Sequence, residues 1–187
     1  RVLARNSRSA PKNLLLVEGI RHVGEAVESG WAIRFVLYCP DLLISEYALS
    51  LIEHLPETVD AFEVSEDILE SIANKKDPQG ILAVVEKPEL SLGIISENDW
   101  DFLVALEEPQ DPGNVGTILR TMDAAGADAL IIIGGGVNPY HPKAIRASMG
   151  THFNVPLITA TKEEFLEWQK EADFFIVGTS ASAMEDY

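Results

Sequence analysis

One segment of ten residues limits the fold of this chain more than any other. The segment 111–120 separates two apolar runs, Phe102–Leu106 and Ala129–Ile133. Proline and glycine at its start favour a tight turn, and the asparagine that follows is a good residue to cap a helix. The segment therefore predicts the order strand, tight loop, helix, strand, which is the repeating unit of an α/β fold.

The expected helix has an apolar face. We expect Pro112 and Gly113 to form the turn and Asn114 to cap a helix that begins at Val115. Apolar residues then recur at the spacing of one helix face, which predicts that this face packs on the sheet. These residues are Val115, Ile118, Leu119 and Met122.

A second face carries Gly116 and Arg120, one turn apart. A residue without a side chain at position 116 leaves room for a ligand beside the guanidinium group, and free N–H groups at a helix start favour an anion. This face indicates a site for a phosphate or a sugar hydroxyl. A well-capped crossover helix with a surface arginine explains the same residues without a ligand, and both interpretations stay open at this stage.

The segment resembles the first signature, Pro-x-Asn-x-Gly-x-x-x-Arg, of the SpoU (TrmH) family of RNA ribose 2′-O-methyltransferases. A second family segment follows at residues 146–150 and 155–157, and residues 16–21 and 78–84 look like the family's small N-terminal substrate-binding domain. The resemblance covers nearly the whole chain, with its three parts in the family's order. The first signature is matched at Pro112, Asn114, Gly116 and Arg120.

The resemblance implies an α/β fold of two domains. A small, ribosomal-protein-like RNA substrate-binding domain would span residues 1–92, and a SPOUT-type (trefoil-knot) methyltransferase domain would span residues 93–187. It also implies S-adenosylmethionine as the cofactor, a homodimer, and ribosomal or transfer RNA as the partner. The family's third signature is absent before Tyr187, and the chain begins with Arg1. We therefore expect a fragment whose methyltransferase domain is incomplete at its C-terminus.

The resemblance also implies the roles of particular residues. Asn114 and Arg120 would be the catalytic residues, with Arg120 meeting the ribose and phosphate of the RNA. A guanidinium group stays protonated in ordinary surroundings, so we expect Arg120 to orient the 2′-hydroxyl and not to accept its proton. Gly178 and Thr179 would contact the cofactor, although an ordinary loop after a strand explains them equally well. Some members carry a glutamate where this chain has Phe153, which would instead pack at the dimer interface.

The charge of the chain is uneven. The net charge is −16, yet residues 1–21 hold five cationic residues against Glu18, a local balance of +4. Proteins that bind RNA usually carry a basic surface. The basic N-terminal tail predicts RNA contacts at Arg5, Arg8 and Arg21, with Arg1 and Lys12 in the same tail. The second signature implies an RNA contact at Arg146, and a structural role for this residue stays open. A solvated tail remains open, and the acidity favours an alternative function, an RNA-binding or ribosome-associated module without methyl transfer.

Composition argues against several other classes of protein. We expect no membrane span, because no apolar run is long enough, and no signal peptide. Cys39 is the only cysteine, which fits a reducing, cytoplasmic setting. The four histidines show no ligand spacing, so we expect no metal site. The run Gly134–Gly136 lacks the spacing of a nucleotide-binding loop and predicts a flexible loop.

Strand and helix signals alternate along both halves. In the first half the alternation predicts a three-layer α/β unit. Residues 88–93 are typical of a linker, which places a boundary near residue 92. In the second half we expect a helix over 143–149, a strand over 155–159, a helix capped by Thr161 and a last strand over 174–178.

Overall fold

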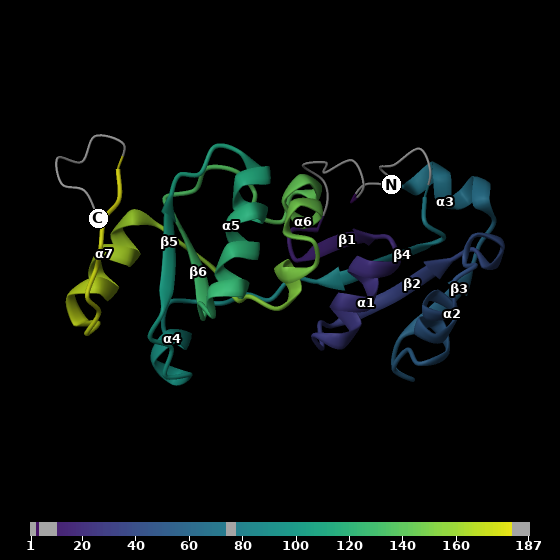
Figure 1. The fold of residues 1–187 in the computed structure, drawn as a ribbon, viewed down its shortest axis with the longest axis horizontal. Coiled ribbons are helices and arrows are strands. Elements are labelled where there is room, and N and C mark those ends of the chain that lie inside the picture. The colour runs from purple at the N-terminus through teal and green to yellow at the C-terminus, as the bar shows by residue number, and fades with distance from the viewer. Residues whose placement is uncertain (1–2, 4–10, 74–77, 181–187) are drawn as a thin grey trace.

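The computed structural model describes residue 3 and residues 11–73 and 78–180, which form two sheets arranged along the long axis of the molecule (Figure 1). Helices cover both sheets. The elements of the first half are β1 (Leu14–Glu18), α1 (Ile20–Glu28), β2 (Ile33–Tyr38), α2 (Glu46–Glu53), β3 (Asp60–Glu63), α3 (Glu66–Ile72) and β4 (Ile81–Glu86). Those of the second half are α4 (Ile94–Glu97), β5 (Leu103–Glu107), α5 (Pro112–Ala125), β6 (Ala129–Ile133), α6 (Pro142–Ser148), β7 (Leu157–Ala160) and α7 (Lys162–Glu171). Two short 3-10 helices, η1 (Pro40–Leu42) and η2 (Thr151–Phe153), lie in the connections.

The first sheet has the strand order β1-β4-β2-β3. Strand β4 runs antiparallel to β1 and β2, whereas β2 and β3 are parallel. Residues 81–85 of β4 are all buried, because alternate side chains meet helices on opposite faces of the sheet. Ile81 and Ala83 pack in a core with α1 and α2, and Leu82 and Val84 pack in a core with α3. The three-layer arrangement expected from the sequence is confirmed.

The second sheet is fully parallel, with the order β5-β6-β7. Its central strand β6 is buried along its whole length, as a parallel strand covered on both faces should be. Leu130 and Ile132 face the core that contains α5, and Ile131 and Ile133 face the core that contains α4 and α7. The packing face predicted for α5 is confirmed, since Val115, Leu119 and Met122 are buried.

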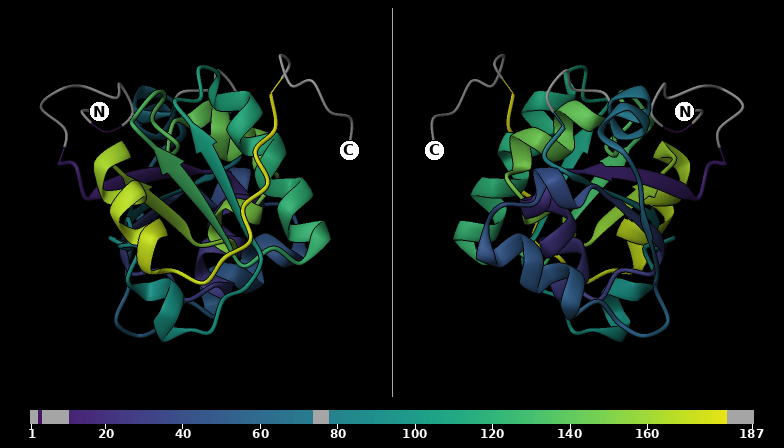
Figure 2. Two further views of the ribbon diagram at one scale, coloured as in Figure 1. Left: turned by 90° about the vertical axis from the view of Figure 1, so that its left-hand side faces the viewer. Right: turned by 90° about the vertical axis from the view of Figure 1, so that its right-hand side faces the viewer.

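The strand expected over residues 174–178 is not found. Residues 173–180 are extended but pair with neither edge strand of the second sheet, and Figure 2 shows them in yellow at the outside of the molecule. Phe174 packs its ring against Trp168, with the ring centroids 5.5 Å apart. Phe175 is 94% exposed. An apolar run makes a strand only where a neighbouring strand supplies hydrogen bonds, and no described strand pairs with this run.

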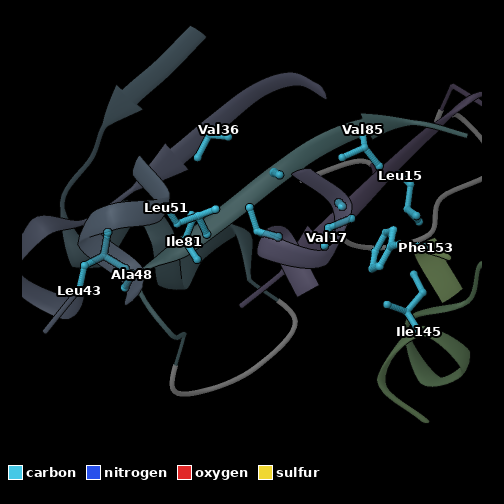
Figure 3. Packing of buried hydrophobic residues seen from close by; sticks show 13 residues of the cluster. Leu15, Val17, Val36, Leu43, Ala48, Leu51, Ile81, Val85, Ile145 and Phe153 are labelled. Carbon is cyan, nitrogen blue, oxygen red and sulfur yellow. The ribbon is translucent and has the colours of Figure 1, made fainter. Parts of the chain in front are cut away.

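One of the hydrophobic cores contains side chains from both halves of the chain. Ile145 of α6 and Phe153 of η2 pack into the core of the first sheet beside Leu15 and Val17 (Figure 3). The Phe153 ring meets the Trp31 ring edge-on at 5.0 Å, and Trp31 Nε1 donates a hydrogen bond to the Phe153 carbonyl oxygen at 3.0 Å. The expectation that Phe153 packs at a dimer interface is therefore wrong. Its side chain is buried inside the chain because Trp31 and the first sheet already cover it.

His152 lies at the same junction and is only 1% exposed. Neither of its ring nitrogens has a hydrogen-bond partner among the described residues, and the Tyr140 ring stands 5.1 Å away. Burial, with a smaller contribution from the charge of His22, lowers the pKa of His152 to about 4. The junction thus holds a histidine that is neutral when the protein is folded.

No helix in the described ranges has both the length and the apolar composition needed to cross a membrane.

We predict that His152 makes the folded state sensitive to mild acid. Its folded pKa of about 4 lies below the ordinary value of 6.5, so between these values the unfolded chain binds a proton that the folded chain does not. The contribution of His152 to the free energy of unfolding should be complete above pH 6.5 and should fall, by up to about 3 kcal/mol, as the pH drops to 4. Urea unfolding at several pH values measures this loss.

The variant His152→Gln should lack that part of the pH dependence. The matched control is His54→Gln, since His54 is exposed at the end of α2. A His152→Gln protein that loses stability with falling pH as steeply as the unmodified protein would contradict the prediction.

Candidate catalytic and RNA-binding site

The signature segment forms the first three turns of α5, at the edge of the second sheet where the parallel strands end. Asp111 caps this helix: its Oδ1 atom accepts hydrogen bonds from the backbone N–H of Gly113 at 2.6 Å and of Asn114 at 3.1 Å. Pro112 occupies the first helical position, where proline lacks no needed hydrogen bond. The expected turn at Pro112 and Gly113 and cap at Asn114 are therefore wrong, because the aspartate before the proline caps the helix three residues earlier.

Asp111 also joins α5 to α6. Its Oδ2 atom lies 2.6 Å from the Nζ atom of Lys143, in the first turn of α6. The hydrogen bond from Lys143 lowers the pKa of the Asp111 carboxyl most, and the amide N–H groups of Asn114 and Gly113 lower it further. One carboxylate thus fixes the start of α5 and its distance from α6. The roles of Asp111 and Lys143 were not predicted from the sequence, although an aspartate directly before a proline is a recognisable helix-start signal.

Gly116 is buried where α5 and α6 cross, and does not face an open space. A Cβ atom at this position would lie 2.7 Å from the Cβ atom of Ala147 and 2.9 Å from the backbone nitrogen of Ser148, and would also clash with the Ala144 carbonyl oxygen. The expectation that Gly116 leaves room for a ligand is wrong, since α6 fills that room. The glycine allows two helices to approach closely, and Figure 1 shows α5 and α6 side by side.

Asn114 and Arg120, the predicted catalytic residues, are both exposed on α5. Their six-residue spacing places them about 120° apart around the helix axis and ~9 Å apart along it, so the helix does not bring their side chains together. The described residues give the Arg120 side chain neither a carboxylate partner nor a hydrogen bond. Its guanidinium group is available to a ligand.

The predicted RNA contacts are spread over both halves. Arg146 is exposed on α6 and lines a small hollow against the first sheet with His22 and Leu16. Arg21, on α1, lies 4.0 Å from the carboxylate of Glu25. Arg5 and Arg8 lie outside the described residues.

Gly178 and Thr179, predicted to contact the cofactor, are exposed in the extended segment after α7. A Cβ atom added to Gly178 would meet no described atom within 4 Å. Neither residue lines the hollow at the carboxyl ends of the parallel strands, which is lined by Glu108, the loop 134–139 and residues 159–164. Neither Asn114 nor Arg120 lines that hollow.

The glycine run 134–136 forms part of that hollow, and contacts hold its last residue in place. All three glycines have positive φ angles, between 74° and 103°. A Cβ atom on Gly136 would lie 2.8 Å from the Glu108 carbonyl carbon, and Val137 donates a backbone hydrogen bond to the Pro109 carbonyl oxygen at 2.8 Å. No group of three or more His, Cys, Asp or Glu side chains in the described ranges is arranged to hold a metal ion.

Comparison with known proteins identifies this arrangement. Residues 101–187 match the SpoU rRNA Methylase family, and residues 3–83 match the MRM3-like substrate binding domain. Together the two matches relate the chain to the SpoU rRNA methylases. The resemblance stated from the three sequence segments is thereby confirmed.

Relatives in this family are similar over most of the chain. A 23S rRNA (uridine(2479)-2′-O)-methyltransferase from Streptomyces viridochromogenes is 34% identical over 167 residues, which are 88% of this chain and 57% of that protein. The 23S rRNA (guanosine(2553)-2′-O)-methyltransferase RlmP of Bacillus subtilis is 28% identical, over 90% of this chain and 63% of its own length. The chain spans less than two thirds of each of these relatives.

Solved structures of the family share the fold. The crystal structure of the SpoU methyltransferase AviRb from Streptomyces viridochromogenes in complex with AdoMet superposes with a TM-score of 0.78 at 32% identity, covering 91% of this chain and 64% of that one. An AdoMet-bound rRNA methyltransferase from Sinorhizobium meliloti gives a TM-score of 0.70 at 32% identity, with 84% and 58% covered. The α/β fold class expected from the sequence is confirmed.

We predict that Gly116→Ala destabilises the protein by about 1–3 kcal/mol, the usual cost of forcing extra volume into a packed contact. The added methyl group would meet the backbone of α6, which cannot rotate away as a side chain can. The matched control is Gly93→Ala, where φ is −59° and the nearest atom to an added Cβ lies 3.7 Å away. Urea unfolding compares the two variants, and equal stabilities would contradict the role assigned to Gly116.

Proposed function

We propose that this protein is an S-adenosylmethionine-dependent RNA methyltransferase that methylates a ribose 2′-hydroxyl, with ribosomal RNA as the favoured substrate. The observation that carries the proposal concerns helix α5, which bears the signature residues and is called the signature helix below. Asp111 and Gly116 fix α5 against its surroundings, while Arg120 on the same helix is exposed without a partner among the described residues. Relatives named as 23S rRNA 2′-O-methyltransferases support the choice of substrate.

Arg120 would bind the RNA next to the ribose that is methylated. Its planar guanidinium group can donate two parallel hydrogen bonds to phosphate oxygens, which fixes the position of the neighbouring 2′-hydroxyl. A guanidinium group is a poor base, so proton removal would fall to the phosphate or to another group. Holding two reactants in line is a large part of the catalysis that methyl transfer needs.

Asn114 would support the ribose at the start of the same helix. Its backbone N–H is already used by the Asp111 cap, whereas its side chain is exposed. An amide side chain offers both a donor and an acceptor, which suits a sugar hydroxyl that does the same. We propose this role for Asn114 in place of the capping role expected from the sequence.

S-adenosylmethionine would supply the methyl group as an activated sulfonium. The described residues around Gly178 and Thr179 do not form a cradle for it, since both residues are exposed and nothing packs within 4 Å of a Cβ on Gly178. Cofactor contacts at these two residues remain part of the proposal, and the roles given above for Arg120 and Asn114 concern the RNA alone. The AdoMet complexes of the similar structures support the choice of cofactor.

The two-domain division at residue 92, the trefoil knot, the homodimer and the cytoplasmic setting belong to the same proposal. Two separate sheets, one complete at Glu86 and the other beginning at Leu103, support a boundary between them. Exposed apolar side chains in the second half, among them Phe102 and Leu166, support a second copy as partner. Arg21 and Arg146 would add RNA contacts from the first and second half respectively.

The proposal is tested by incubating the protein with ribosomal RNA and methyl-labelled S-adenosylmethionine. We expect label in the RNA at a position that becomes resistant to alkaline cleavage, because a methylated 2′-hydroxyl can no longer attack the adjacent phosphate. RNA binding without any transfer of label would favour the RNA-binding module considered in the sequence analysis.

We predict that Arg120→Ala lowers the single-turnover rate of methylation by at least ~10²-fold, the lower range for loss of a positioned catalytic group. Its thermal stability should change little, because Arg120 is exposed on a helix and alanine is a good helix former. Arg120→Lys should restore little of the rate, since a point charge cannot replace the guanidinium fork. The control is Arg34→Ala, whose guanidinium group pairs with Glu86 on the first sheet. Near-normal turnover in Arg120→Ala would show that the catalytic assignment is wrong.

A further inference from the structure

The cationic side chains of this acidic protein divide into two groups. Of its 14 Lys and Arg residues, nine lie in the described ranges. Four of these nine lie within 4.0 Å of a carboxylate, namely Arg21, Arg34, Lys143 and Lys162. The other five have no ion-pair partner among the described residues, namely Lys12, Lys87, Arg120, Arg146 and Lys170. Cations left unpaired on a chain with a net charge of −16 are candidates for binding an anion.

Two of the five lie in one hollow, between the two sheets. This linker hollow is lined by Lys12, Asn13, Lys87, Asn138, Tyr140 and Thr159, with Glu89 and apolar residues completing its wall. Lys12 and Asn13 come directly before β1, and Lys87 directly follows β4. Because β1 and β4 are antiparallel, with Leu14 opposite Glu86, their pairing brings these residues to the same end of the first sheet.

The backbone fixes this end of the sheet. Lys87 donates its backbone N–H to the Asn13 carbonyl oxygen at 2.8 Å, one step beyond the last strand pair. The Lys87 ammonium group stands 5.5 Å from the centre of the Tyr140 ring, at the junction where α6 and η2 meet the first sheet. The contact combines a cation with an aromatic face and keeps the ammonium group near the junction.

The chemistry of the lining residues suits a phosphate group. Two ammonium groups, two amide side chains and two hydroxyls supply donors from several directions, while Glu89 is the single acidic residue in the wall. Burial lowers the pKa of the Lys87 ammonium group, so an anion bound beside it would stabilise its charged form. A phosphodiester carries one negative charge over two free oxygens, which matches a site with two cations and one carboxylate.

The linker hollow adjoins a second hollow of the described surface. Asn138, Pro139 and Thr159 line both the linker hollow and the hollow at the carboxyl ends of the parallel strands. A strand of RNA held at one of these hollows is therefore directed along the surface toward the other.

We propose that the linker hollow binds a backbone phosphate of the RNA substrate, through Lys12 and Lys87, and so contributes to RNA affinity from between the two sheets. This inference rests on the proposed function, because it takes RNA as the ligand. It adds a binding site that lies apart from the signature helix and from the predicted arginine contacts.

The experiment compares Lys12→Gln, Lys87→Gln and the double variant with Lys170→Gln in the whole chain. Lys170 is the matched control, since it is an exposed lysine of α7 without an ion-pair partner among the described residues and does not line the hollow. The probe is a fluorescein-labelled RNA stem-loop of mixed sequence, and its Kd is measured over a range of NaCl concentrations. Each substitution in the hollow should weaken binding and reduce the slope of log Kd against log salt by about 0.7–0.9, whereas Lys170→Gln should change neither.

Two further arms separate a phosphate contact from a structural effect. Lys87→Arg should keep the wild-type slope, because it keeps the charge, and thermal melts should show all variants folded. Inorganic phosphate should compete with the RNA only weakly, since it lacks the other contacts of the RNA. Tight, Lys87-dependent binding of inorganic phosphate would assign the hollow to a free anion and overturn the inference.

The outcomes distinguish this inference from the proposed function. Unchanged slopes in the double variant, with RNA binding and methylation intact, would overturn the inference and leave the function standing. Reduced slopes without methyl transfer would support the inference and place the protein with RNA-binding modules. A wild-type protein that does not bind the stem-loop would overturn the inference, whereas the proposed function is judged by the methylation of ribosomal RNA.

Discussion

The close crossing of α5 and α6 at Gly116 is the contact on which the rest of the arrangement depends. Helix α5 carries the signature residues, and α6 carries Ile145 into the core of the first sheet. Because Gly116 lets the two backbones meet, the position of the signature helix is fixed to α6 and, through it, to the first half of the molecule. The Asp111–Lys143 ion pair also joins the start of α5 to the start of α6. A residue that the family signature suggests for ligand contact thus acts by packing.

The junction between the sheets combines rigid packing with polar contacts. Trp31 and Phe153 pack edge-to-face and share a hydrogen bond, and Ser29 Oγ donates to Asn154 Oδ1 at 2.6 Å. The aromatic rings exclude water from the centre of the junction, while the polar pairs occupy its rim. An RNA that contacts both halves would therefore meet one preorganised surface, which lowers the entropic cost of binding.

Local sequence patterns predicted the alternation of strands and helices, because most strands are apolar runs and most helices begin at a serine, threonine or proline signal. The exposed strand β3, Asp60–Glu63, is an exception. The errors have physical causes. The start of α5 was misplaced because Asp111 competes with Asn114 for the cap, and only the structure shows which carboxylate or amide is in reach. The roles of Gly116 and Phe153 depend on partners more than 25 residues away in the chain, which no local pattern contains.

The prediction of a strand over residues 174–178 was wrong, because these apolar residues have no neighbouring strand in the described part of the chain. The signature predicts Asn114 and Arg120 as site residues, and this stays a prediction. Lys12 and Lys87 share a hollow only because β1 and β4 pair, which no local pattern shows.

The sequence separation across the junction has a consequence for how the protein is made. All strand pairs of the first sheet lie between Leu14 and Glu86, so they can form as soon as that part of the chain leaves the ribosome. The contact between Trp31 and Phe153, however, can form only after another part of the chain is made, because Phe153 lies 122 residues after Trp31. At ~5–20 residues per second, the first sheet would spend several seconds with the apolar surface around Leu15 and Trp31 uncovered. That surface is where a nascent chain of this protein would be most exposed to aggregation and to chaperones.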